Sequence, residues 1–200
     1  MPDHPSAPAL PTASQLPIGL AGHLYLIGLP GSGKTTLGRQ LAAHYGREFV
    51  DLDEVVVREA GRSIPEIFAV ESELGFRQRE AAALTRVAAR PKLLVVATGG
   101  GTPCFHHNLQ LLRCTGFVLW LAVPVPELAR RLAAAGQAAA RPLLAATAAP
   151  ATESPETALN SHLTRTLAAR QQFYAHAHLQ HPGGGPAEVV AALAAAGFRP

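Results

Sequence analysis

The stretch GLPGSGKTT, residues 28–36, constrains the fold more than any other part of the sequence. It fits the pattern G-x-x-x-x-G-K-[ST], in which glycines allow several backbone N–H groups to point inward at one anion. The apolar segment 24–27 precedes it, and Leu37, Leu41 and Tyr45 follow it at helical spacing. The sequence therefore predicts a strand, a phosphate-binding loop and a helix, in that order.

The chemistry of such a loop assigns roles to its residues. Lys34 would reach the β- and γ-phosphates of a nucleotide, and the Thr35 hydroxyl would ligate Mg²⁺. The helix that begins near Lys34 would direct its positive N-terminus at the same charge. The expected nucleotide contacts are Gly31, Ser32, Gly33, Lys34, Thr35 and Thr36. A glycine-rich turn that binds nothing is the alternative.

Composition restricts the class of protein. The chain has 200 residues, 48% of them hydrophobic, which suits one globular domain with a sizeable core. A net charge of +3 is too small and too scattered to favour nucleic acid as a partner. No run reaches the roughly 18 apolar residues of a membrane span. Cys104 and Cys114 show neither metal-ligand spacing nor disulfide density, which favours a reducing cytoplasm.

The Pro-, Ala- and Ser-rich residues 1–20 contain no Lys or Arg and are expected to form a disordered tail before a single domain, 21–200. Within that domain, apolar runs predict strands that alternate with helices. The expected strands are 24–27, 49–50, 93–97, 117–123 and, weakly, 178–180. Helices are expected in 61–90 (two, the second long), 124–136, 153–177 and 186–198. This alternation predicts an α/β fold with a parallel sheet of about five strands.

Chemically unusual residues follow several of these strands. Asp51 and Asp53 come after the second expected strand, and Gly99 to Gly101 come after the third. Because parallel strands present their carboxyl ends at one edge of the sheet, these groups should meet the phosphate-binding loop in one crevice. A solvated turn is the alternative for the two aspartates.

A phosphate-binding loop alone allows a GTPase, an ATPase or a small-molecule kinase. The N-K-x-D motif expected of GTPases is absent from the sequence, and the LLVVA strand ends in TGGG rather than in the Asp that many ATPases carry there. A carboxylate beside the transferred phosphate can contact Mg²⁺ through water or accept a proton from an attacking hydroxyl. Asp51 and Asp53 are the nearest candidates for these roles.

The motifs GLPGSGKTT, DLDEVVVREAGRSIPEIF, GFRQRE, TGGG, RPLL and RQQFY occur in an order and at spacings that resemble the shikimate kinase family, within the nucleoside monophosphate kinase-like P-loop group. The resemblance runs from about Leu24 to Gly197. It implies a three-layer P-loop NTPase fold with a five-stranded parallel sheet and a mobile lid. It also implies transfer of the ATP γ-phosphoryl group to the 3-hydroxyl of shikimate, with ATP and Mg²⁺ as cofactors, in a cytoplasmic monomer.

The resemblance also implies roles in binding shikimate. Asp53 would bind the hydroxyls and act as the base for the 3-hydroxyl, while Asp51 would lie near Mg²⁺. Arg77 and Arg170 would bind the carboxylate, since the planar guanidinium can pair with two oxygens. The triplet Gly99, Gly100 and Gly101 would contact the acceptor, with the Gly100 N–H facing it.

The lid implied by the resemblance covers about 132–150. Arg141 would swing over the phosphates, neutralise charge in the transition state and help exclude water. Arg130 or Arg131 would flank the adenine, and Pro186 would lie near it.

Simpler alternatives remain for several residues. Arg77 could belong to a solvated helix face, and Arg170 could pack against Tyr174 one helical turn later. Arg79 and Glu80 fit a solvated or salt-bridging role. The sequence also leaves open a kinase of another small hydroxy-acid, such as gluconate, and a kinase-fold ligand sensor without turnover.

Overall fold

The computed structural model describes residues 22–134 and 154–200. Their helices and strands, in chain order, are β1 His23–Ile27, α1 Lys34–His44, β2 Glu48–Asp51, α2 Leu52–Ala60, α3 Ile64–Ala88, β3 Leu94–Ala97, the 3₁₀ turn η1 Thr102–Cys104, α4 Asn108–Thr115, β4 Gly116–Leu121, α5 Val125–Ala134, α7 Pro155–Tyr174, β5 Leu179–His181 and α8 Pro186–Ala195. The five expected strands are confirmed, each to within a few residues.

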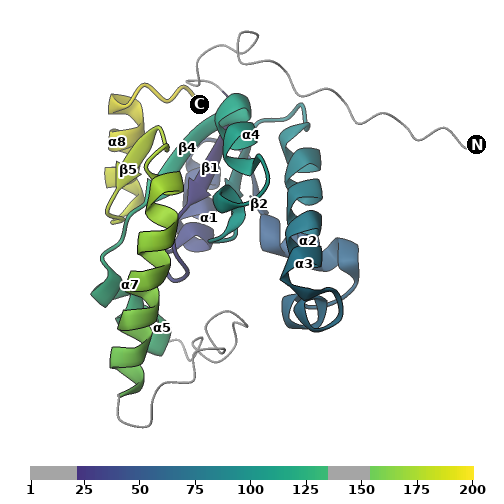
Figure 1. Ribbon diagram of the computed structural model, residues 1–200. Coiled ribbons are helices and arrows are strands. Elements are labelled where there is room, and N and C mark those ends of the chain that lie inside the picture. Colours follow the sequence, from purple (N-terminus) through teal and green to yellow (C-terminus); the bar gives the residue numbers. More distant parts are fainter. Residues whose placement is uncertain (1–21, 135–153) are drawn as a thin grey trace, which may run out of the picture.

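The strands form one parallel sheet in the order β2-β3-β1-β4-β5. β1 lies at its centre, so the loop that follows β1 is also central. In the view of Figure 1, α2 and α3 lie at the right and α7 at the left, and side chains of all three helices pack on the same face of the sheet. The predicted α/β fold with a five-stranded parallel sheet is confirmed.

Successive side chains of each strand point to opposite faces of the sheet, so each strand contributes side chains to two separate hydrophobic cores. Leu24 and Leu26 of β1 pack with Leu37 of α1 and Leu193 of α8. Tyr25 and Ile27 of the same strand join the other core, to which α2, α3, α5 and α7 contribute. The sheet is therefore covered on both faces, which explains why its strands read as continuous apolar runs.

Helix α2 was not expected from the sequence. Asp51 caps its N-terminus, because a carboxylate oxygen accepts a hydrogen bond from the Asp53 N–H at 3.1 Å. Gly61, at φ 63°, ends the helix in the left-handed conformation that glycine adopts without strain. The cap therefore joins the end of β2 to the start of α2, and it places both aspartates at the carboxyl edge of the sheet.

Helix α3 contains a break where the sequence predicts two helices. Ser63 and Glu66 form a reciprocal capping box at its start. Ser72 has φ 62° and ψ 179°, which interrupts the helical backbone. Both expected helices are therefore present as the two halves of α3.

In the parts of the chain that the structure describes, no helix combines the length and apolar character needed to cross a bilayer. Cys104 and Cys114 are both free thiols.

Candidate active site

The loop between β1 and α1 has the backbone geometry of an anion cradle. Gly28, Gly31 and Gly33 have φ values of 140°, 80° and 89°, which residues with side chains rarely adopt. A Cβ on Gly28 would stand 2.7 Å from the carbonyl oxygen of Leu121. The glycines are therefore required by backbone conformation and, at Gly28, by close packing on β4.

Lys34 begins α1 and folds back over this loop. Its ammonium group donates hydrogen bonds to the carbonyl oxygens of Gly28 and Leu29, each at 2.9 Å. A hollow of about 740 Å³ opens beside the loop, and its lining includes Lys34, Thr35 and Thr36. The hollow thus combines a helix N-terminus, inward-facing loop residues and an ammonium group, which are the elements that bind phosphate.

Thr35 and Asp51 lie in contact at this hollow. The Thr35 hydroxyl donates to a carboxylate oxygen of Asp51 at 2.8 Å. No group of three or more His, Cys, Asp and Glu side chains suited to a metal occurs among residues 22–134 and 154–200. Mg²⁺ generally takes one or two protein oxygens, with substrate phosphates and water completing the octahedron, so one hydroxyl and one carboxylate fit this ion.

The glycine triplet after β3 lies among the other predicted site residues. A Cβ on Gly99 would stand 3.0 Å from Asp53 Oδ1 and 2.7 Å from Glu80 Oε1. A Cβ on Gly100 would stand 3.1 Å from Arg170 Nη1, and one on Gly101 would stand 2.5 Å from Arg77 Nη2. These distances bring together side chains from three helices. They also explain why no side chain can be accommodated at Gly99 or Gly101 without displacement.

Arg77 is buried, with 3% of its surface exposed, so the alternative of a solvated helix face is wrong. It donates from Nη1 to Glu80 at 2.8 Å and from Nη2 to Glu73 at 3.1 Å. Its guanidinium also lies over the ring of Phe105, 4.2 Å from the centroid. Two carboxylates and an aromatic face thus fix the orientation of this cation.

Glu80 is fully buried, so the solvated role considered for it is wrong and the salt-bridging role is right. One carboxylate oxygen pairs with Arg77, and the other accepts a 2.6 Å hydrogen bond from the Thr102 hydroxyl. A buried carboxylate is stable only with such partners. Arg79, by contrast, lies on the surface and pairs with Glu71, as expected.

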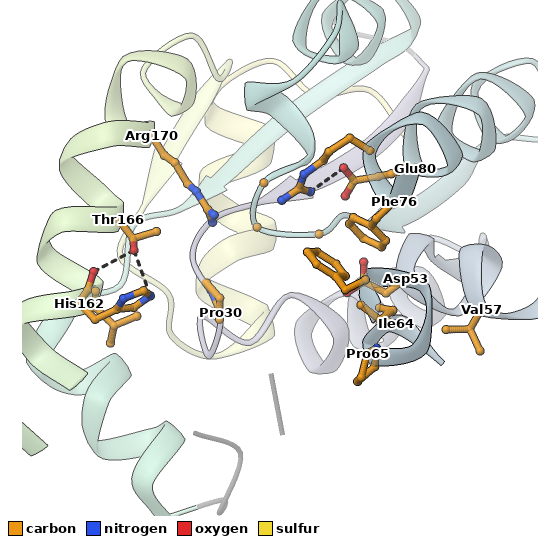
Figure 2. A pocket seen from close by; sticks show the side chains of 16 residues that line it. Pro30, Asp53, Val57, Ile64, Pro65, Phe76, Glu80, His162, Thr166 and Arg170 are labelled. Carbon is orange, nitrogen blue, oxygen red and sulfur yellow. Dashed lines mark hydrogen bonds and ion pairs between the residues drawn. The ribbon is translucent and has the colours of Figure 1, made fainter. Parts of the chain in front are cut away.

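Arg170 reaches the same site from the opposite wall. Figure 2 shows its side chain extending from α7 toward the glycine loop, with Asp53 across the cavity. Both residues line a cavity of about 390 Å³, which also contains Arg77. Two cations and two carboxylates therefore line a single small space, with Glu80 already paired to Arg77. This combination suits a hydroxylated acid.

The rest of that cavity is largely apolar on the α2 and α3 side and polar on the α7 side. The apolar wall is formed by Val57, Ile64, Pro65, Phe68 and Phe76. On α7, the His162 ring lies 3.3 Å from the Thr166 hydroxyl (Figure 2). Burial, followed by the nearby Arg165 and Arg170, lowers the pKa of His162. This imidazole is therefore neutral near pH 7.

The hollow of about 740 Å³ beside the phosphate-binding loop, called the phosphate hollow below, and the smaller cavity of about 390 Å³ share part of their lining. Asp53, Gly99 and Gly100 belong to the wall of both. A ligand in the phosphate hollow and a ligand in the smaller cavity would therefore meet at Asp53. Transfer of a group between two bound substrates requires that they meet in this way.

Several predicted residues lie at the edge of the site or beyond it. Arg130 and Arg131 are both exposed and both pair with Glu127, and Arg131 also lines the phosphate hollow. Pro186 opens α8 at the surface, close to Gly183 and Gly184, which line the phosphate hollow. Arg141 and most of the expected lid, about 132–150, fall outside the described residues.

Four side chains that shape the site were not assigned to it from the sequence. Glu80 carried a signal, since it follows Arg77 at the i,i+3 spacing of helical ion pairs. Thr102 and Phe105 follow the glycine triplet without a motif of their own. His162 lies two helical turns before Arg170, so its place on the cavity wall could have been inferred once α7 was predicted.

Comparison with known proteins gives a consistent result. A family model described as shikimate kinase matches residues 30–193. The chain is 51% identical over 157 residues to a shikimate kinase of Synechococcus elongatus, covering 78% of this chain and 75% of that relative. It is similar to the solved structure of a shikimate kinase from Acinetobacter baumannii in complex with shikimate, with a TM-score of 0.71 and 35% identity over 85% of this chain and 88% of that one. A gluconokinase from Sinorhizobium meliloti is similar at a TM-score of 0.51 and 17% identity over 89% and 92% of the two chains, a likeness in fold alone.

Proposed function

This chain belongs to the shikimate kinase family, and we propose that it transfers the γ-phosphoryl group of ATP to the 3-hydroxyl of shikimate through the residues described above. The observation that carries the proposal is the shared wall of the two hollows, formed by Asp53, Gly99 and Gly100. ATP occupies the phosphate hollow in this proposal, and shikimate occupies the smaller cavity.

Shikimate is held at its carboxylate end by Arg77 and Arg170. Both guanidinium groups border the glycine triplet, and the paired carboxylates of Glu80 and Glu73 keep Arg77 oriented. Arginine suits this task because it can bind both oxygens of a carboxylate at once. The ring hydroxyls are thereby directed toward Asp53.

Asp53 is the base in this proposal. It accepts the proton of the 3-hydroxyl as that oxygen forms its bond to the γ-phosphorus, while the bond from phosphorus to the β–γ bridging oxygen breaks and ADP leaves. Most of the rate enhancement comes from holding the two substrates in line and from neutralising charge. The position of Asp53 on the wall between the hollows supports this role.

On the donor side, the loop backbone and Lys34 bind the phosphates. Thr35 and Asp51 would hold Mg²⁺, which neutralises charge on the β- and γ-phosphate oxygens when bound. Arg131 is the better placed of the two neighbouring arginines to flank the adenine, because it lines the phosphate hollow. Arg141 is proposed to complete the charge neutralisation from the lid.

A gluconate kinase is the second candidate, since gluconate is also a hydroxylated carboxylate. The low identity to the gluconokinase and the higher identity to shikimate kinases favour shikimate. A sensor without turnover would not need Lys34, Asp53 and the phosphate hollow together. The monomeric state and the cytoplasmic location stay predictions.

The test is a coupled assay of ADP release with purified protein, ATP and Mg²⁺. Shikimate, gluconate and a reaction without acceptor are compared side by side. Turnover that depends on shikimate supports the proposal. Turnover with gluconate alone would keep the kinase fold and overturn the acceptor, and shikimate binding without turnover would favour the sensor.

A further inference from the structure

Tyr174, at the end of α7, contacts the glycine triplet through its hydroxyl group. The side chain is fully buried, and the hydroxyl donates a 2.5 Å hydrogen bond to the carbonyl oxygen of Gly100. Burial raises the pKa of Tyr174 to about 12. The hydroxyl therefore keeps its proton and remains a donor at every pH at which the protein would be assayed.

This hydrogen bond fixes one peptide plane of the loop. The carbonyl of Gly100 belongs to the same peptide unit as the N–H of Gly101, and none of the described peptide bonds is cis. In a planar trans peptide, the C=O and the N–H point in opposite directions. The N–H of Gly101 is therefore directed away from Tyr174.

The residues around this peptide connect it to the acceptor cavity. Gly100 and Gly101 line the cavity, whereas Tyr174 is absent from its lining among the described residues. A Cβ on Gly101 would touch the Arg77 guanidinium, so the Gly101 backbone lies directly beside that cation. Tyr174 thus acts on the cavity through its neighbours, chiefly the Gly100 carbonyl that it holds and also the Arg170 guanidinium, which interacts with its hydroxyl.

The Tyr174 side chain is itself held in place by packing. The Tyr174 ring packs against Trp120 of β4, with 5.6 Å between ring centroids. Arg170, one helical turn earlier on α7, reaches the same loop at Gly100. Glycine backbone is otherwise the most permissive in the chain, so a triplet of glycines needs external contacts to hold one conformation.

We propose that Tyr174 is a positioning residue for the acceptor: its hydrogen bond to Gly100 orients the Gly100–Gly101 peptide so that this backbone, together with Arg77, is preorganised to bind the carboxylate end of the acceptor. The inference rests on the proposed function for the identity of that acceptor. It assigns Tyr174 no contact with either substrate.

The test compares Tyr174→Phe with Tyr25→Phe. Tyr25 is a matched control, because it is also fully buried and its hydroxyl makes a 2.8 Å hydrogen bond, to Thr115, away from both hollows. Each variant removes one buried hydroxyl, so both should lose a similar amount of thermal stability. The variants differ in that the hydroxyl lost from Tyr174 held the glycine loop and interacted with Arg170, whereas the hydroxyl lost from Tyr25 contacted neither.

We expect Tyr174→Phe to raise the KM for shikimate about five- to tenfold, the effect of losing one well-placed hydrogen bond, with a change in the KM for ATP below about twofold. Tyr25→Phe should leave both values unchanged. Equal KM values for shikimate in the two variants would overturn the inference. Wild-type turnover with shikimate is measured in the same series, so failure of the proposed function would be seen separately, in the wild type.

A second measurement remains decisive if Tyr174→Phe does not fold. In wild-type protein labelled with ¹⁵N-glycine, adding shikimate should shift the Gly101 amide resonance strongly, because the acceptor binds beside that N–H. An unchanged Gly101 resonance at saturating shikimate would contradict the proposed arrangement.

Discussion

Substituting Gly101 by alanine should selectively weaken acceptor binding. Gly101 has φ −92° and ψ −15°, so alanine fits the backbone without strain. Its methyl carbon would stand 2.5 Å from Arg77 Nη2 and 2.8 Å from Cζ. Since comfortable contacts begin near 3.5 Å, the guanidinium must move by about 1 Å.

Arg77 cannot move this far without cost. It is held by Glu80 at 2.8 Å and lies against Phe105, so a shift strains or breaks a charge-assisted hydrogen bond or misaligns its contact with the acceptor. Hydrogen bonds to charged groups contribute about 1.5–3 kcal/mol, which corresponds to a rise of about 10- to 150-fold in the KM for shikimate. The KM for ATP should change by less than about twofold, because the phosphate-binding loop is untouched.

The assay is the coupled release of ADP at saturating ATP with shikimate varied. Gly185→Ala is the control, because a Cβ at Gly185 meets no atom within 4 Å. An unchanged KM for shikimate in Gly101→Ala would refute the argument that Arg77 is fixed beside this glycine and binds the acceptor.

Three further predictions follow from the site and the core. Asp53→Asn should lower kcat by at least about 100-fold while shikimate still binds, as equilibrium titration would reveal, because the proposed base is lost. Thr35→Val should raise the Mg²⁺ concentration needed for half-maximal activity, and an unaltered Mg²⁺ dependence would exclude Thr35 as a ligand. His23 is buried, its ring nitrogen accepts from the Leu94 N–H, and burial lowers its pKa. The unfolded chain therefore binds more protons below about pH 6.5, so stability should fall as pH decreases through that value, and His23→Gln should flatten this slope in urea unfolding.

The parts of the fold that the sequence predicted depend on local patterns. The phosphate-binding loop carries its own motif, and the buried parallel strands are continuous apolar runs. Helix α2 was missed because Val55, Val56 and Val57 are β-branched residues that favour strands. The Asp51 cap and the burial of Val55 and Val56 against the core override that preference.

The site residues that could be predicted from the sequence are those that belong to recognisable motifs. Asp53, Arg77 and Arg170 were assigned through resemblance, and the structure brings all of them to one cavity. The contacts that hold them were not predictable, because they join distant segments: Thr102 bonds to Glu80, and Tyr174 bonds to Gly100 across 74 positions of the chain. No local periodicity encodes such pairs.

The most direct test of the central claim is to identify the product. Wild-type protein would be incubated with ATP, Mg²⁺ and shikimate, and the product analysed by ¹H–³¹P correlation NMR, with Asp53→Asn run in parallel. We expect a phosphate ester coupled to the proton on carbon 3 of shikimate, formed by the wild type and nearly absent with the variant. A phosphate on another hydroxyl, or the same product at an unchanged rate with Asp53→Asn, would contradict the proposed geometry.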